Sequence, residues 1–115
     1  MKNIKNWFFR SLALTLVLVL GSFNVYAVDQ SICHTGANVI LHNNGSLKAC
    51  QLKNNYEANN IQCKNDAPVS FYDNGNLESC VLSAEATMAE NKCKQDAPIS
   101  FYIDAKLNSC VKPDN

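Results

Sequence analysis

Six cysteines carry the clearest chemical potential in this chain, and they share one spacing. Cysteines can form disulfides, act as thiolate nucleophiles or bind metals. The chain has no Cys-x-x-Cys sequence, so thiol–disulfide oxidoreductase chemistry lacks its usual active pair. The regular spacing therefore favours structural disulfides in a repeat protein. Sixteen residues separate the members of each pair and thirty residues separate the starts of successive pairs, which are Cys33 and Cys50, Cys63 and Cys80, and Cys93 and Cys110.

The two histidines and the aspartates give weak support for other chemistry. Cys33-His34 is the only adjacent cysteine and histidine, but neighbouring strand side chains point to opposite faces and a bridged cysteine has no thiolate. A metal site would need His34 and His42 with carboxylates such as Asp29, and histidines eight residues apart are more often solvated. We therefore predict no catalytic residues, no metal site and no cofactor.

Asp66 and Asp96 recur before Ala-Pro in two of the units. A glycosidase would use two such acids held across a cleft at a defined separation. An aspartate at a turn just before a proline already has a local role, because its carboxylate accepts backbone hydrogen bonds. We therefore predict a turn role for both residues.

Residues 1–27 are typical of a secretory signal peptide. They combine a basic start, an apolar run from Leu12 to Leu20 and a small-x-small sequence that ends at Ala27. The apolar run is shorter than the ~20 residues that span a bilayer, so we expect no transmembrane segment after cleavage. The mature chain would be one repeat domain, residues 28–115, in a periplasm or outside the cell. Such compartments are oxidising and favour disulfides.

The charge balance bears on the class of partner. The leader holds three of the ten basic residues and none of the ten acidic ones, so the mature chain carries three net negative charges. Binding to a phosphate backbone demands clustered Lys and Arg, which argues against nucleic acid. We expect the partner to be a protein or a component of the cell envelope.

The repeat units span about residues 33–52, 63–82 and 93–112, and the second and third are identical at twelve of twenty positions. Each unit has a short apolar run, a turn signal and a second run ending near a cysteine. In the second unit the turn is Asn74-Gly75, which tolerates the positive φ of tight hairpins. The fold class predicted is all-β: three tandem thirty-residue β-hairpin repeats forming an antiparallel meander sheet, open or closed, stapled by disulfides.

A three-residue turn with glycine in a bulge would place Phe71 opposite Leu77, with Val69 and Val81 on the same side and Tyr72 on the other. The equivalent pairs, also predicted to be core, are Leu41 with Leu47 and Phe101 with Leu107.

Outside the core, Tyr72, Tyr102, His34 and His42 form the possible binding surface.

In the third unit Asp104-Ala105 replaces Asn-Gly, and a Cβ at the left-handed position carries a penalty. The last hairpin should therefore be the loosest.

Two disulfide schemes fit the spacing. Pairing within each unit makes three self-contained modules and is slightly favoured. Pairing between units arises if the strand holding Cys63 lies beside Val69 to Tyr72, because Cys63 and Cys80 would then be ~10 Å apart, beyond disulfide reach. It would join Cys50 to Cys63 and Cys80 to Cys93, and would need a closed sheet to join Cys33 to Cys110. The connectors, residues 53–62 and 83–92, are expected to be loops, with at most a helical turn or a short strand before each cysteine.

The sequence Phe71-Tyr72-Asp73-Asn74-Gly75-Asn76-Leu77 resembles the hairpins of bacterial MORN-like repeat proteins. The similarity covers residues 39–47, 69–77 and 99–107 and implies a row of antiparallel hairpins acting in protein or membrane-surface contacts rather than catalysis. The leading hypothesis is an exported, non-catalytic interaction module. The alternative is a small secreted effector or inhibitor in which the divergent first unit, with His34, His42 and Asn43, contacts a target.

Overall fold

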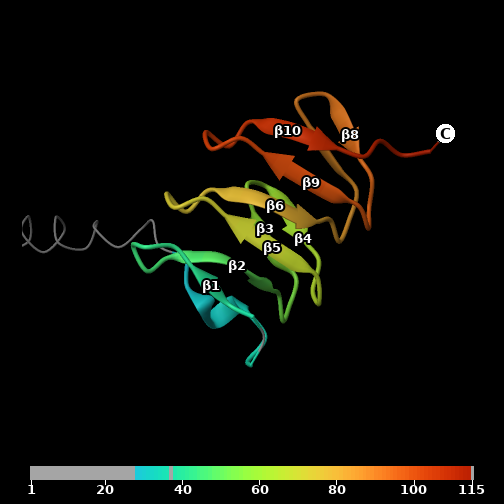
Figure 1. The fold of residues 1–115 in the computed structure, drawn as a ribbon. Coiled ribbons are helices and arrows are strands. Elements are labelled where there is room, and N and C mark those ends of the chain that lie inside the picture. The colour runs from blue at the N-terminus through green and yellow to red at the C-terminus, as the bar shows by residue number, and fades with distance from the viewer. Residues whose placement is uncertain (1–27, 37, 115) are drawn as a thin grey trace, which may run out of the picture.

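The computed structural model describes residues 28–36 and 38–114 (Figure 1). The predicted signal peptide, residues 1–27, lies outside the described residues. The described part is nearly all β-structure, preceded by one short 3-10 turn. Its elements are η2 (Gln30–Ile32), β1 (Ile40–Leu41), β2 (Leu47–Gln51), β3 (Tyr56–Ala58), β4 (Ile61–Cys63), β5 (Pro68–Phe71), β6 (Leu77–Val81), β7 (Ala86–Met88), β8 (Asn91–Cys93), β9 (Pro98–Phe101) and β10 (Leu107–Cys110).

One six-stranded antiparallel sheet holds the three repeat hairpins, in the order β1-β2-β5-β6-β9-β10 (Figure 1). Two small sheets, β3-β4 and β7-β8, form the connectors between units. Side chains of both connectors, including Tyr56 and Met88, pack against the buried core, so they form a second layer under one face of the main sheet. The predicted disulfide-stapled all-β meander is confirmed, and the sheet is open, with β1 and β10 as its edges.

The hairpin turns have the predicted three-residue geometry. In the second unit the N–H of Gly75 donates to the carbonyl of Tyr72 at 3.0 Å, and the N–H of Tyr72 donates to the carbonyl of Asn76 at 2.8 Å. Gly75 has φ of 90°, in the left-handed region where a side chain is unfavourable. The side chain of Asn74 accepts the N–H of Asn76 at 2.9 Å and closes the turn locally.

Ala105 occupies the same left-handed position in the third unit, with φ of 76°. We expect Ala105→Gly to raise the free energy of unfolding by about 1 kcal/mol, because glycine adopts this backbone without a Cβ penalty. Urea denaturation followed by circular dichroism measures the change. Gly45→Ala is the reciprocal control: its φ is 88° and an added Cβ would meet nothing within 4 Å, so the loss would come from the backbone alone. A destabilised Ala105→Gly variant would contradict the prediction.

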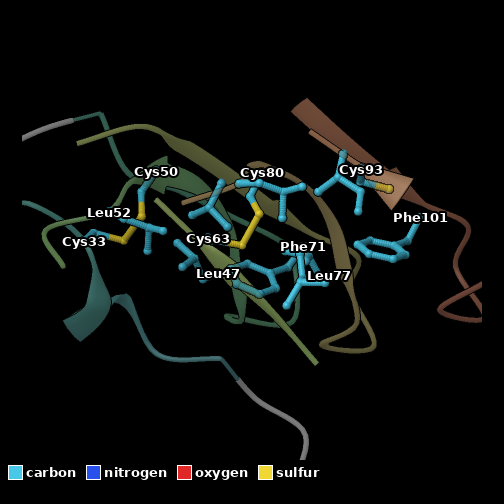
Figure 2. Close-up of a cluster of buried hydrophobic side chains, with 14 residues drawn as sticks. Cys33, Leu47, Cys50, Leu52, Cys63, Phe71, Leu77, Cys80, Cys93 and Phe101 are labelled. Carbon is cyan, nitrogen blue, oxygen red and sulfur yellow. A yellow bond between two sulfur atoms is a disulfide. The ribbon is translucent and has the colours of Figure 1, made fainter. Parts of the chain in front are cut away.

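The core lies between the sheet and the connector layer (Figure 2). Phe71 is opposite Leu77, as predicted, and the equivalent pairs in the other two units have the same register. The buried core residues are Cys33, Leu47, Cys50, Leu52, Ile61, Cys63, Val69, Phe71, Leu77, Cys80, Leu82, Cys93, Ile99 and Phe101. Five of the six cysteines therefore also pack in the core, and Cys110, on the edge strand β10, is only partly buried.

Two core predictions are wrong. Val81 does not share the inner face with Val69, because a register shift between β5 and β6 places Cys80 opposite Val69 and turns Val81 toward the outer face. Leu41 has its predicted partner Leu47 but remains 47% exposed, since no strand among the described residues lies beyond β1. Strict alternation of side chains could not predict the face on which Val81 lies, because one extra residue in a strand reverses the faces of the residues after it.

The connectors are hairpins rather than loops, and the short strand expected before each cysteine is present as β4 and β8. The turn between β3 and β4 has Asn59 and Asn60 at φ of 50° and 65°, and the equivalent turn between β7 and β8 has Ala89 and Glu90 at 49° and 70°. Positive φ at both central residues is the geometry of the tightest hairpin turns. Packing against the core stabilises these short strands although the connectors are rich in polar residues. Tyr56, for example, packs edge-to-face on Phe71 with ring centroids 6.1 Å apart.

Candidate interaction surface

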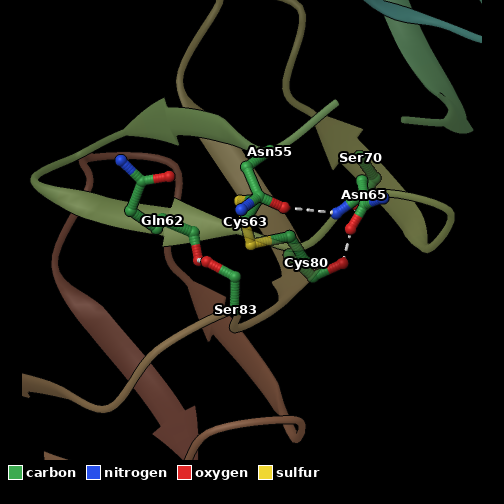
Figure 3. Close-up of a disulfide and its surroundings, with 8 residues drawn as sticks. Asn55, Gln62, Cys63, Asn65, Ser70, Cys80 and Ser83 are labelled. Carbon is green, nitrogen blue, oxygen red and sulfur yellow. Dashed lines mark hydrogen bonds between the residues drawn. A yellow bond between two sulfur atoms is a disulfide. The ribbon is translucent and has the colours of Figure 1, made fainter. Parts of the chain in front are cut away.

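Two of the three disulfides link a connector hairpin to the main sheet, and the third links Cys33, which directly follows η2, to β2. Cys63 on β4 is bonded to Cys80 on β6, with a Cα–Cα distance of 5.7 Å (Figure 3). The favoured within-unit pairing is confirmed, and the between-unit scheme is wrong because β4 lies under the sheet rather than beside β5 within it. The other two bridges join Cys33 to Cys50 and Cys93 to Cys110, and in all three the second cysteine is 17 positions after the first.

Hydrogen bonds beside the central disulfide hold the connector in place. The N–H of Asn65 donates to the Asn55 side chain at 2.9 Å, and the Ser83 hydroxyl donates to the carbonyl of Gln62 at 3.3 Å (Figure 3). These contacts lie on either side of the bridge and fix both ends of the β3-β4 connector. The disulfide and these hydrogen bonds together hold the β3-β4 connector against the main sheet in the second unit.

Neighbouring units are joined by a recurring bond from a side chain to a backbone carbonyl. His42 Nε2 donates to the carbonyl of Phe71 at 2.8 Å, and Tyr72 Oη donates to the carbonyl of Phe101 at 2.9 Å. His42 and Tyr72 hold equivalent positions, directly after the first strand of a unit. We call each contact between a unit and the next, β2 with β5 and β6 with β9, a joint.

Ion pairs also cross the joints. His34 Nε2 lies 2.6 Å from Asp66 Oδ1, and Lys64 Nζ lies 2.9 Å from Asp96 Oδ1. All four side chains are at least 40% exposed, so each pair contributes little to stability. Asp66 lies at a turn, as predicted, with φ of 60°, but its carboxylate contacts the side chains of His34 and Asn65 rather than the expected backbone N–H groups. His34 and His42 are thus occupied with joint contacts, a use that no spacing within a single unit could reveal.

Tyr102 differs from its equivalents, because no described strand lies beyond β10 to accept its side chain. Its side chain is 53% exposed, and no described residue accepts a hydrogen bond from its hydroxyl. The predicted row of binding tyrosines therefore consists of one joint donor, Tyr72, and one exposed residue, Tyr102, at the end of the sheet.

This difference predicts unequal effects of the same substitution. Tyr72→Phe should lower the free energy of unfolding by about 1 kcal/mol, because the Phe101 carbonyl loses its part-buried donor. Tyr102→Phe should leave the stability of the isolated chain unchanged within error. Urea denaturation of both variants checks the pair, and equal losses would show that the joint bond does not stabilise the fold.

The outer face of the main sheet carries a row of small side chains across five strands, from β2 to β10, and the row ends at Ile40 on β1. The pairing Ile40↔Ala49, Ala49↔Ser70, Ser70↔Ser79, Ser79↔Ser100 and Ser100↔Ser109 makes the row continuous. The hydroxyls of Ser70 and Ser79 lie 2.7 Å apart, and those of Ser100 and Ser109 lie 2.8 Å apart. The serine hydroxyls therefore form hydrogen bonds with one another in pairs, and their short side chains leave a flat surface.

A shallow hollow of about 330 Å³ crosses the middle of this face. Its rim and floor include Ala49, Pro68, Ser70, Ser79, Val81 and Pro98. None of these residues is titratable, so the hollow offers contact area and hydroxyl groups rather than acid or base chemistry. Strict alternation along β6 placed Val81 on the inner face, so the sequence did not predict this surface, to which the register shift between β5 and β6 brings Val81.

Within residues 28–36 and 38–114, no three His, Cys, Asp or Glu side chains come close enough to hold a metal ion together. The same part of the chain contains no helix with the length and apolar character needed to cross a membrane.

Comparison with known proteins gives no relative: no family model, no curated protein and no solved structure matches the chain. The resemblance to MORN-like hairpin repeats therefore stays a prediction. The three disulfides themselves indicate that the chain folds in an oxidising setting of the kind that exported proteins meet.

Proposed function

We propose that this chain is an exported, non-catalytic interaction module whose flat outer sheet face contacts a protein or an envelope component. The observation that carries the proposal is the shallow hollow over Ser70, Ser79 and Val81, on a face that no other described layer covers. A disulfide-stapled sheet presents such a face with little loss of conformational entropy on binding. Small hydroxyl and proline side chains suit close contact with a broad partner surface.

The signal sequence in residues 1–27 and the three disulfides support a periplasmic or extracellular location for this module. The weak negative charge of the mature chain favours neither a nucleic acid nor an anionic lipid surface. A protein or an uncharged envelope component is therefore the expected partner.

Capture from envelope extracts tests this function. The oxidised protein, immobilised after export, should retain one or a few specific components, and Ser79→Arg should abolish retention by placing a bulky charge in the hollow. Gln62→Arg is the matched control, because it adds the same side chain at an exposed site on the connector layer. Failure to retain any component would overturn the proposal, and equal retention by Ser79→Arg would exclude the outer face.

The alternative of a secreted effector that reads a target through the first unit receives less support. Its candidate residues His34 and His42 are engaged with Asp66 and Phe71 of the second unit. Replacing the first unit by a copy of the second tests the alternative directly, because a target-reading unit would lose its activity.

A further inference from the structure

The large exposed hydrophobic residues of this chain lie at the two open edges of one sheet. Among the described residues, Ile40 and Leu41 are exposed at the β1 edge, and Tyr102, Ile103 and Val111 are exposed at the β10 end. Figure 1 shows β1 and β10 on opposite sides of the sheet. Exposed apolar side chains beside unpaired strand edges mark sites that can pair with another chain.

The joints inside the chain show what covers such edges. At each joint the second strand of a unit pairs with the first strand of the next: Cys50 is opposite Val69, and Cys80 is opposite Ile99. Burial at the joint is nearly complete, since Phe71 is only 1% exposed whereas its equivalent Leu41 is 47% exposed. Within residues 28–36 and 38–114, β10 is a second strand with no further unit beside it, and β1 is a first strand with none before it.

The side-chain hydrogen bond found at both joints has a third equivalent position in the repeat. His42 and Tyr72 each donate to a carbonyl of the next unit, at Phe71 and Phe101. Tyr102 is the third member, and no described carbonyl accepts its hydroxyl. The carbonyl equivalent to those of Phe71 and Phe101 in the first unit belongs to Leu41, on the open edge.

We propose that copies of this chain associate head to tail, with β10 of one copy paired antiparallel to β1 of the next. The joint register extends without change, so that Ser109 meets Ile40 of the next copy and Cys110 meets its Val39. Tyr102 Oη then donates to the Leu41 carbonyl of the next copy. This contact does not use the outer-face hollow, so it is independent of the proposed function. A heterologous contact of this kind leaves both ends of the assembly open and extends the sheet from copy to copy.

The new joint is weaker than the internal ones, and three residues set its strength. Gly36 holds the repeat position of Asp66 and Asp96, whose carboxylates form ion pairs at the internal joints, so the new joint lacks this ion pair. Lys112 holds the repeat position of Leu82, which is buried. Asp104 replaces the asparagines whose amides donate to carbonyls of the next unit, as Asn44 does to Asp73 at 3.0 Å. The association is therefore reversible and depends on concentration, rather than a permanent polymer.

Sedimentation velocity of the exported, oxidised protein tests the proposal over about a hundredfold concentration range reaching about 1 mM. The mean mass should rise with concentration. Asp104→Asn combined with Lys112→Leu should move the rise to at least about tenfold lower concentration, because it restores two joint contacts. A wild-type chain that stays monomeric throughout the range would overturn the proposal, whatever the double variant does.

Blocked variants distinguish a head-to-tail contact from any other. Leu41→Lys blocks the head and Tyr102→Lys blocks the tail, and both sites are about half exposed, so the monomer fold should tolerate them. Each variant alone should be monomeric, while an equimolar mixture should form heterodimers that grow no further. Gln62→Lys on the connector layer should associate like the wild type. Association of Tyr102→Lys alone, or no heterodimer in the mixture, would overturn the geometry.

Discussion

A variant with both Cys63 and Cys80 replaced by alanine should lose about 3 kcal/mol of unfolding free energy. The bridge closes a loop with a sequence separation of 17, and its removal restores chain entropy to the unfolded state. A domain of this size buries too little apolar surface to absorb such a loss easily. Urea denaturation of the oxidised variant, followed by circular dichroism, measures the change.

The third unit provides an internal control for this loss. The bridge between Cys93 and Cys110 has the same separation, so the entropic part of its loss should be equal. Cys110 is only partly buried, whereas Cys63 and Cys80 are both buried, so alanine leaves a smaller packing defect in the third unit. The central variant should therefore be the less stable of the two. A loss below about 1 kcal/mol in both variants would contradict a stabilising role of the bridges.

The sequence predicted the repeat hairpins well because their signals are local. Asn74-Gly75 specifies a tight turn, and the turn length then fixes the register that places Phe71 opposite Leu77. The repeat only slightly favoured pairing of Cys63 with Cys80, since each unit carries one complete pair, and the position of β4 under the sheet decides between the two schemes. Such features depend on residues close together in the chain, and the thirty-residue period shows them more than once.

The connectors and the interaction surface could not be predicted because they depend on contacts between units. Residues 83–92 have a composition suited to helix, yet packing under the sheet makes them a hairpin. The sequence predicted a solvated side chain for His42, whereas in the structure its Nε2 lies 2.8 Å from the Phe71 carbonyl oxygen of the next unit. Leu41 carries a core-type side chain, and only the absence of a preceding unit among the described residues leaves it exposed.

Truncation of Phe71 and of Leu41 should have very different effects, although both hold the same place in the repeat. Phe71 is 1% exposed and packs edge-to-face on Tyr56, so Phe71→Ala should cost about 3 to 5 kcal/mol in unfolding free energy through lost contacts and a cavity. Leu41 is 47% exposed at the sheet edge, so Leu41→Ala should cost about 1 kcal/mol or less.

Urea denaturation of both variants at low protein concentration separates the fold from any association between copies. At such concentrations the β1 edge is unpaired, and Leu41 contributes only its contact with the first hairpin. If copies pair through β1, the cost of Leu41→Ala should grow with protein concentration while that of Phe71→Ala stays constant, because association stabilises the folded state by mass action. Equal costs for the two variants at low concentration would mean that the Leu41 edge is already covered in the single chain, and the open-ended sheet described above would be wrong.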